Sequence, residues 1–291
     1  MILSYKDYVK GLIRSRILEN GIRDNKFSNK KYGHDSLSNE RQLIDKLILL
    51  ITRVIFSETV NINPGVSVIT CTNRINSLGN ILNNYLSQKY PIKELIIVIN
   101  NNSISLSKWK EEVKFISDIR IFKKDEKYSL GECLNFAIER ANYPHISKFD
   151  DDDYYGPYYL TDTLNVFKYT DASIVGKYTA YAYMEGRNEL VLRFPGNENR
   201  YIDSVLGSTL TFKKEISENV KFRRIPKGSD TVFLRACLLL GYKIYSTDRF
   251  NHVVHRRRNL NTHSWKISEK EFLKNCILIK KTKDYNAEVT I

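Results

Sequence analysis

Apolar residues recur at helical spacing in the first part of the chain. One such stripe lies near the N-terminus, has basic residues between its members, and consists of Ile2, Tyr5, Val9, Leu12 and Ile13. A second stripe lies between Glu40 and Phe56 and consists of Leu43, Leu47, Leu50 and Val54. This spacing predicts amphipathic helices. Because the turn-forming residues 61–65 follow them, we expect residues 1–63 to be a helical N-terminal extension.

From Val66 onward, short apolar runs alternate with helical stretches. Strands are expected at residues 66–70, 94–99, 119–122 and 145–149. Helices are expected at residues 75–90, around Trp109, and from Ser129, where Ser129 and Glu132 have the spacing of a capping box. Repeated β–α alternation predicts an α/β fold, with a mostly parallel sheet flanked by helices.

The second half of the chain has a more mixed pattern. It predicts strands at residues 173–183, 189–194, 207–212 and 243–245, and a helix from Gly228 to Gly241. We therefore divide the chain into a helical extension (residues 1–63), a main domain (residues 64–265) and a C-terminal tail (residues 266–291).

Three polar loops follow strands of the predicted sheet. These loops are residues 70–73, 100–103 and 150–153. In sheets of this kind, ligands bind beyond the carboxyl ends of the strands. The third loop is four consecutive aspartates, which repel one another unless a cation, basic groups or water relieves them. Asp150 and Asp152 share one face in extended backbone, and oxygen ligands suit Mg²⁺, Mn²⁺ or Ca²⁺ rather than Zn²⁺. A solvated acidic turn is the alternative, but three converging polar loops weigh against it.

Composition narrows the class of protein. The chain has 291 residues, of which 42% are hydrophobic and 27% charged, as in an ordinary globular protein. A net charge of +13 implies attraction to nucleotide phosphates, anionic lipid or nucleic acid. No aromatic–basic interleaving typical of an RNA-binding module is present, so we expect no nucleic acid partner. The basic N-terminal stripe fits either packing on the main domain or contact with an anionic membrane or a partner.

The location of the protein is inferred from its cysteines and its N-terminus. Four widely spaced cysteines without a CxxC pair argue against zinc fingers and a disulfide framework. The N-terminus has scattered charges rather than a secretory signal, and the apolar segment 43–56 is interrupted by Asp45, Lys46 and Arg53. We expect a cytoplasmic protein, and the alternative is a cytoplasmic protein in peripheral contact with the inner face of the membrane.

Residues 64–265 resemble a family 2 glycosyltransferase of the GT-A (Rossmann-like) fold. The resemblance is carried by six segments in order: residues 66–74, 94–100, 129–135, 149–153, 205–210 and 228–231. It implies an inverting, metal-dependent enzyme that moves a sugar from a nucleotide-diphosphate donor to a hydroxyl acceptor. It also implies a divalent cation, Mn²⁺ or Mg²⁺, as cofactor. Asn100 or Asn101 stands where the family usually has aspartate, so the donor preference is open. Ser229 stands where the family has glutamate, whereas the aspartate that carries the chemistry is present as Asp230.

The resemblance also assigns roles to individual residues. The residues expected to contact the donor are Thr70, Thr72, Asn73, Arg74, Asn100, Asn101, Asn135, Asp150 and Asp151. The residues expected to bind the metal are Asp152, Asp150 and a C-terminal histidine, either His263 or His255. Asp230 is expected to be the catalytic base, ionised by the dipole of its helix, although a plain N-cap is its alternative role. Asp153 is expected to order the loop.

Further basic residues are placed only by their position in the chain. Lys177, Tyr178 and Arg193 lie between the acidic loop and Asp230 and are expected to line the acceptor pocket. Residues 256–258, three consecutive arginines, suit either the diphosphate or a solvated surface.

Two other functions are alternatives to a glycosyltransferase. A nucleotidyltransferase would normally have a glycine-rich phosphate loop, which residues 70–74 lack. A non-catalytic module that binds surfaces through a cation is the second alternative. For the transferase, the acceptor could be a glycan, a lipid-linked intermediate or a peptide, in the synthesis of surface or spore polysaccharide or another glycoconjugate.

Overall fold

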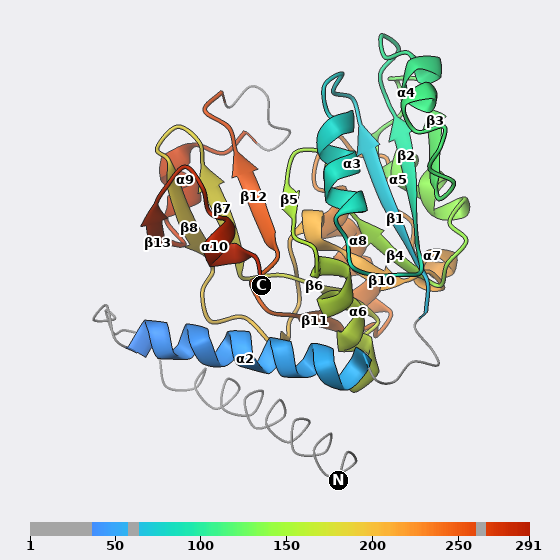
Figure 1. Ribbon diagram of the computed structural model, residues 1–291. Helices are drawn as coiled ribbons and strands as arrows, with labels where there is room; N and C mark the ends of the chain where they lie inside the picture. Colours follow the sequence, from blue (N-terminus) through green and yellow to red (C-terminus); the bar gives the residue numbers. More distant parts are fainter. Residues whose placement is uncertain (1–36, 58–63, 260–265) are drawn as a thin grey trace.

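The computed structural model describes residues 37–57, 64–259 and 266–291 (Figure 1). In this part of the chain the large sheet has eight strands in the order β3-β2-β1-β4-β10-β6-β11-β9. Their bounds are Val66–Thr72 (β1), Lys93–Ile99 (β2), Ile119–Lys123 (β3), His145–Lys148 (β4), Ile174–Gly176 (β6), Arg200–Tyr201 (β9), Thr211–Lys213 (β10) and Ile244–Ser246 (β11). Strands β3, β2, β1 and β4 are parallel, whereas β10 is antiparallel to both its neighbours. The predicted α/β fold with a mostly parallel sheet is confirmed.

Helices cover both faces of the large sheet (Figure 1). Their bounds are Leu78–Leu86 (α3), Leu106–Glu112 (α4), Leu130–Glu139 (α5), Tyr159–Tyr169 (α6), Ile216–Asn219 (α7) and Ser229–Leu239 (α8). Successive residues of a strand point to opposite faces. Ile69 of β1 packs in one cluster with Leu134 of α5 and Phe233 of α8, whereas Val68 packs in the other with Ile81 of α3. Strand β2 is buried on both faces, which explains its nearly continuous apolar sequence.

Local signals located some of these helices and missed two, α6 and α7. The predicted capping box is present: Ser129 accepts from the backbone of Glu132, and Glu132 bonds back to the Ser129 backbone. Helix α6 was not predicted. Its N-cap residue is Tyr158, which makes no side-chain cap hydrogen bond, so the usual start signal is missing.

A second sheet lies beside the first (Figure 1). Among the described residues it has five strands, in the order β13-β8-β7-β12-β5. Their bounds are Tyr154–Tyr155 (β5), Ala180–Met184 (β7), Glu189–Arg193 (β8), His252–Arg256 (β12) and Cys276–Lys281 (β13). Strand β5 directly follows the four aspartates and pairs with β12. The acidic loop therefore lies where the two sheets meet.

Three segments of the second half differ from the prediction. The expected strand 173–183 is two strands, because β6 ends at Gly176 in the large sheet and β7 begins at Ala180 in the second. Both strands are fully buried, so the apolar pattern does not mark the change of sheet. The expected strand 207–212 begins as the 3-10 turn η1 (Gly207–Thr209). Residues 266–291 add helix α9 (Glu269–Leu273), strand β13 and helix α10 (Asn286–Val289) to the second sheet's side of the molecule.

Helix α2 (Leu37–Ser57) runs past α6 and the second sheet (Figure 1). The predicted helix is present, but its apolar stripe is not the buried face. The members of that stripe, Leu43, Leu47, Leu50 and Val54, are 43–59% exposed. Leu49, Thr52 and Ile55 are buried instead. The first predicted stripe lies outside the described residues. No described helix combines the length and apolar character needed to cross a bilayer.

Charged contacts attach α2 to the main domain. The Arg53 guanidinium donates to both carboxylate oxygens of Asp162 in α6, at 2.7 and 2.8 Å, and to the carbonyl of Ile291 at 2.9 Å. Asp162 is buried and has a second donor, the amide of Asn251 at 3.0 Å. Arg249 adds a contact to Asp45 of α2 at 3.3 Å. These polar contacts, together with the buried Leu49 and Ile55, attach the helix in its observed orientation.

Replacing Arg53 by methionine should lower the free energy of unfolding by about 3–5 kcal/mol, because it leaves Asp162 buried without its main partner. Urea denaturation followed by circular dichroism measures this change. The double variant Arg53→Met/Asp162→Asn should be more stable than Arg53→Met alone, since it removes both charges. Equal stability of the wild type and Arg53→Met would contradict this account of the helix.

Candidate active site

The loops that follow β1 and β2 meet at one edge of the large sheet, as predicted, and the loop after β3 joins them there. The side-chain amide of Asn101 donates to the backbone carbonyl of Asn73 at 2.8 Å. The backbone N–H of Asn100 donates to the carbonyl of Thr72 at 2.7 Å, and its side chain donates to the carbonyl of Asp125 at 2.8 Å. The polar loops are therefore linked into one surface at the carboxyl ends of the strands, where α/β proteins bind ligands.

The four aspartates leave the loop after β4 in different directions. Asp150 lies 2.5 Å from the ammonium of Lys148 and is partly exposed. Asp151 is buried and accepts hydrogen bonds from the Thr72 hydroxyl and the Arg74 guanidinium. These contacts give Asp151 a structural task, since they tie the acidic loop to the loop after β1.

The last two aspartates face the second sheet. Asp152 lies 3.0 Å from the guanidinium of Arg74 and 3.6 Å from that of Arg257. Asp153 is buried and accepts a hydrogen bond from the backbone N–H of His255 in β12 at 3.0 Å. The expectation that Asp153 orders the loop agrees with this contact.

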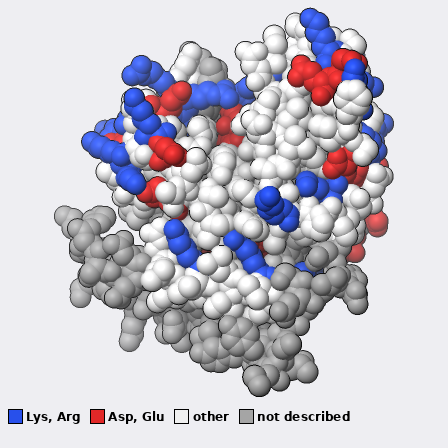
Figure 2. Space-filling model, viewed as in Figure 1, with Lys and Arg blue, Asp and Glu red and all other residues white. Residues whose placement is uncertain are grey.

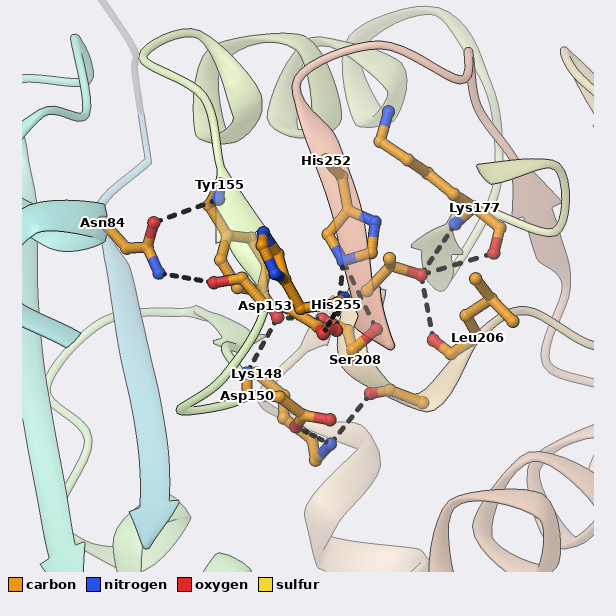
Figure 3. A network of polar contacts seen from close by, with 12 residues as sticks. Asn84, Lys148, Asp150, Asp153, Tyr155, Lys177, Leu206, Ser208, His252 and His255 are labelled. Atoms are coloured by element: carbon orange, nitrogen blue, oxygen red, sulfur yellow. Dashed lines mark hydrogen bonds and ion pairs between the residues drawn. The ribbon is translucent and has the colours of Figure 1, made fainter. Parts of the chain in front are cut away.

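Helix α3 holds the backbone of the acidic loop. The Asn80 amide donates to the carbonyls of Asp151 and Asp153, at 3.0 and 3.1 Å. The Asn84 amide donates to the Asp153 carbonyl at 2.9 Å and accepts from the Tyr155 N–H at 3.1 Å (Figure 3). Buried backbone groups need such partners, so these two asparagines fix the shape of the loop.

A cavity of about 450 Å³ opens beside the acidic loop. It is lined by Arg74, Ile75, Asn76, Ser77, Asn80, Asp151, Asp152, Asp153, Tyr154, His255, Arg257 and Tyr285. Figure 2 shows basic and acidic side chains gathered in the hollow at the top of the molecule. A cavity with both signs of charge suits a ligand that carries phosphate and a cation.

The charges around the cavity are not fully balanced. Burial and the neighbouring carboxylates raise the pKa of Asp152 and of Asp153 above the usual range. Burial also lowers the pKa of His255, which favours its neutral form. The Nε2 atom of His255 lies 2.5 Å from the hydroxyl of Tyr285, which comes from the C-terminal segment. Additional positive charge at this site would favour ionised aspartates.

Asp230 lies in the first turn of α8, close to the acidic loop. Its Oδ2 atom is 3.6 Å from the Lys148 ammonium, and its Oδ1 atom has no hydrogen-bond partner among the described residues. The N-cap of α8 is Gly228, so Asp230 is not a plain N-cap. The expected lowering of its pKa is wrong: burial raises the pKa of Asp230, and Lys148 only partly opposes this. Backbone at Gly207 approaches so closely that a Cβ there would overlap Asp230.

Thr70 and Asn135, which are expected to contact the donor, are not among the residues that line the cavity. Thr70 is buried in β1, with 1% of its surface exposed, and so does not face the cavity. The Asn135 amide accepts from the backbone N–H of Phe222 at 3.0 Å and donates to its carbonyl at 2.8 Å. Asn135 therefore anchors the segment that leads to α8, a contact between residues 87 positions apart that no local pattern indicates.

The residues expected at the acceptor pocket also have other contacts. Lys177 is 1% exposed and lies 3.1 Å from the Asp248 carboxylate, so it lines no pocket and that expectation is wrong. The ring of Tyr178 packs against Phe194 at 4.8 Å between centroids, and the guanidinium of Arg193 lies 4.5 Å from the same ring.

Of the three consecutive arginines, only Arg257 lines the cavity. Arg256 is buried and donates to the carbonyl of Ile267 at 3.0 Å. The backbone N–H of Arg258 donates to Glu185 at 2.9 Å. Arg256 is the last residue of β12 and the other two follow the strand, so the three arginines have separate partners and do not share one ligand.

The predicted metal ligands are near one another but do not form a closed set. Within the described ranges, no group of three or more histidine, cysteine, aspartate or glutamate side chains is arranged to hold a metal ion. Asp150 and Asp152 each have basic partners, and His255 has Tyr285. His263 lies outside the described residues.

The family model for glycosyl transferase family 2 matches residues 67–235. The chain belongs to this family. It is therefore an enzyme, a glycosyltransferase, and the resemblance noted in its sequence is confirmed. The matched range includes the acidic loop and Asp230. The nucleotidyltransferase and the non-catalytic module are set aside by this membership.

Solved structures show the same fold at low sequence identity. A structure titled S. aureus TarS 1-349 in complex with UDP-GlcNAc aligns with a TM-score of 0.56 and 16% identity, over 72% of this chain and 64% of that one. The mannosyltransferase PcManGT from Pyrobaculum calidifontis, in complex with GDP-Man and Mn²⁺, aligns with a TM-score of 0.50 and 15% identity, over 74% and 67%. This chain thus spans less than two thirds of the TarS structure. No curated protein matches the sequence.

Several residues of the site were missed by sequence analysis. Asn80 and Asn84 lie one helical turn apart on α3 and so share a face, a spacing that a search for polar helix faces would have found. Lys148 and Asp150 lie two positions apart at the end of β4. Tyr285 gave no signal, because its place depends on the fold of the second sheet.

Replacing Gly207 by alanine should displace the Asp230 carboxylate, because the added Cβ overlaps it. A displacement of about 1 Å at a catalytic group can lower kcat about 100-fold. The measurement is release of nucleoside diphosphate from a sugar nucleotide, together with the thermal midpoint. Gly79→Ala is the matched control, because no atom lies within 4 Å of a Cβ there. Similar rates for the two variants would contradict the close approach.

Proposed function

We propose that this enzyme transfers a sugar, with inversion at the anomeric carbon, from a nucleotide-diphosphate donor to a hydroxyl acceptor. The observation that carries the proposal is that Asp150 and Asp230 lie at one ammonium, that of Lys148, at 2.5 and 3.6 Å. One oxygen of Asp230 has no partner within the described part of the chain. The proposed base, Asp230, therefore lies next to the acidic loop that is proposed to bind the donor.

The chemistry requires one proton transfer and one displacement. The Asp230 carboxylate takes the proton of the acceptor hydroxyl, and the oxygen bonds to the anomeric carbon of the donor sugar. The bond from that carbon to the diphosphate breaks, and the nucleoside diphosphate leaves with the electron pair. Attack opposite to the leaving group inverts the configuration. Thr72, Asn73, Arg74, Asn100 and Asn101 are the proposed donor contacts.

A divalent cation, Mn²⁺ or Mg²⁺, fits the acidic loop. Asp152 and Asp150 would hold it, because hard cations prefer carboxylate oxygens, and burial and the neighbouring carboxylates raise the pKa of Asp152. His255, whose lowered pKa favours a neutral imidazole, is a further candidate ligand, and His263 remains one from the sequence. When bound, the cation supplies Lewis-acid stabilisation of the charge on the diphosphate. The Arg257 guanidinium lies 3.6 Å from Asp152 and would also face the negative charge of the diphosphate.

The donor and acceptor are proposed only as classes. TarS and PcManGT have been solved with UDP-GlcNAc and GDP-Man, which makes these two compounds the first donors to test. We propose a glycan, a lipid-linked intermediate or a peptide as the acceptor, in surface or spore glycoconjugate synthesis. We also propose a cytoplasmic location, with the net charge of +13 favouring peripheral contact with anionic lipid.

Asp152→Asn should abolish Mn²⁺-dependent binding of the donor, whereas Asp230→Asn should bind the donor and transfer it about 100- to 10,000-fold more slowly. Calorimetry with UDP-GlcNAc and GDP-Man, with and without Mn²⁺, measures binding. Release of nucleoside diphosphate measures turnover with water or an added acceptor.

The control for both variants is Asp171→Asn, which removes an exposed carboxylate paired with Lys243. It should leave binding and turnover unchanged. If Asp230→Asn turns over at the wild-type rate, Asp230 is not the base. If the wild type binds the donor equally well without Mn²⁺, the proposed metal site is wrong.

A further inference from the structure

Lys148 has an unusual position for a charged side chain. It is the last residue of β4, and only 3% of its side chain is exposed. Its ammonium contacts Asp150 Oδ1 at 2.5 Å, the carbonyl of Gly207 at 3.0 Å and Asp230 Oδ2 at 3.6 Å. Figure 3 shows Lys148 pointing to Asp150 below the network that surrounds Ser208. One buried cation therefore touches three segments of the site.

The ammonium donates two hydrogen bonds, to Asp150 and to the carbonyl of Gly207, and forms an ion pair with Asp230. Lys148 does not line the cavity beside the acidic loop, and its burial keeps it away from any ligand there. Its effect on a reaction must therefore pass through the groups that it contacts.

The two carboxylates would behave differently without this cation. Neighbouring ionised carboxylates repel each other, and burial makes that repulsion stronger than it would be in water. An ammonium between them reverses the interaction and fixes both carboxylates relative to β4. The carbonyl of Gly207 fixes the third segment, η1, whose backbone is in close contact with Asp230.

We propose that Lys148 is a positioning residue for sugar transfer: it holds Asp150, on the donor side, and Asp230, on the acceptor side, at a fixed separation. This inference rests on the proposed function, since it needs Asp230 as the base. Lys148 acts on the rate of transfer through Asp230 rather than by binding substrate.

The chain contains a matched control for this role. Lys177 is equally buried, at 1%, and its ammonium contacts the carboxylate of Asp248 at 3.1 Å and its carbonyl at 2.9 Å. Neither Lys177 nor Asp248 lines the cavity beside the acidic loop. Loss of a buried ion pair destabilises the protein in both cases, but only Lys148 is linked to Asp230.

The test compares Lys148→Met with Lys177→Met in the full chain. Nucleoside diphosphate release from UDP-GlcNAc and GDP-Man with Mn²⁺ gives kcat, calorimetry gives donor affinity, and thermal unfolding gives stability. Both variants should unfold at lower temperature. Lys148→Met should lower kcat about 100-fold, with a smaller change in donor affinity. Lys177→Met should retain kcat within about threefold. Equal loss of kcat in both would overturn the proposal.

A double-variant cycle distinguishes positioning from a general loss of structure. If Lys148 acts through Asp230, then Lys148→Met in an Asp230→Asn background should cause no further loss of kcat. Additive losses would overturn the proposal while leaving the proposed function intact. A wild-type enzyme that neither binds nor turns over any sugar nucleotide would overturn both. Should Lys148→Met not fold, Lys148→Arg takes its place in the cycle: its longer side chain keeps the charge but shifts the carboxylates, so the same non-additive loss is expected.

Discussion

Neutralisation of four adjacent carboxylates is the constraint on which the site depends. Residues 150–153 are too close together to be buried as a group unless each finds its own partner. Asp150 meets Lys148, Asp151 meets Arg74 and Thr72, and the last two aspartates meet groups of the second sheet. The loop therefore has its shape only when the first loop of the large sheet and strand β12 are both in place.

This requirement explains how the two sheets are joined. Strand β5 begins directly after the last aspartate and pairs with β12, which brings His255 to the loop and is followed directly by Arg257. On the other side, Lys148 links the loop to Gly207 and Asp230. One acidic segment thus connects the donor side, the second sheet and the helix that carries the proposed base. The second sheet is therefore part of the candidate active site.

Membership of glycosyltransferase family 2 agrees with the placement of these groups, and the details give the family pattern a local form. A buried lysine stands two positions before the first aspartate, and a serine precedes Asp230 where the family usually has glutamate. Lys148, at the end of β4, places a positive charge 3.6 Å from Asp230, the proposed base. This charge comes from outside the segment that contains Asp230, so the motif around Asp230 does not by itself describe the candidate site.

The sequence by itself determined the α/β class, the parallel strands with their polar loops, the capping box at Ser129 and the acidic segment, because these depend on local periodicity and on neighbouring residues. Only the tertiary structure decided which face of α2 is buried, where residues 173–183 change sheet, and that Asn135 binds Phe222. It also decided that an arginine more than 100 positions away lies beside Asp152. Such contacts join distant segments, and a local pattern carries no record of which distant partner will satisfy a buried charge.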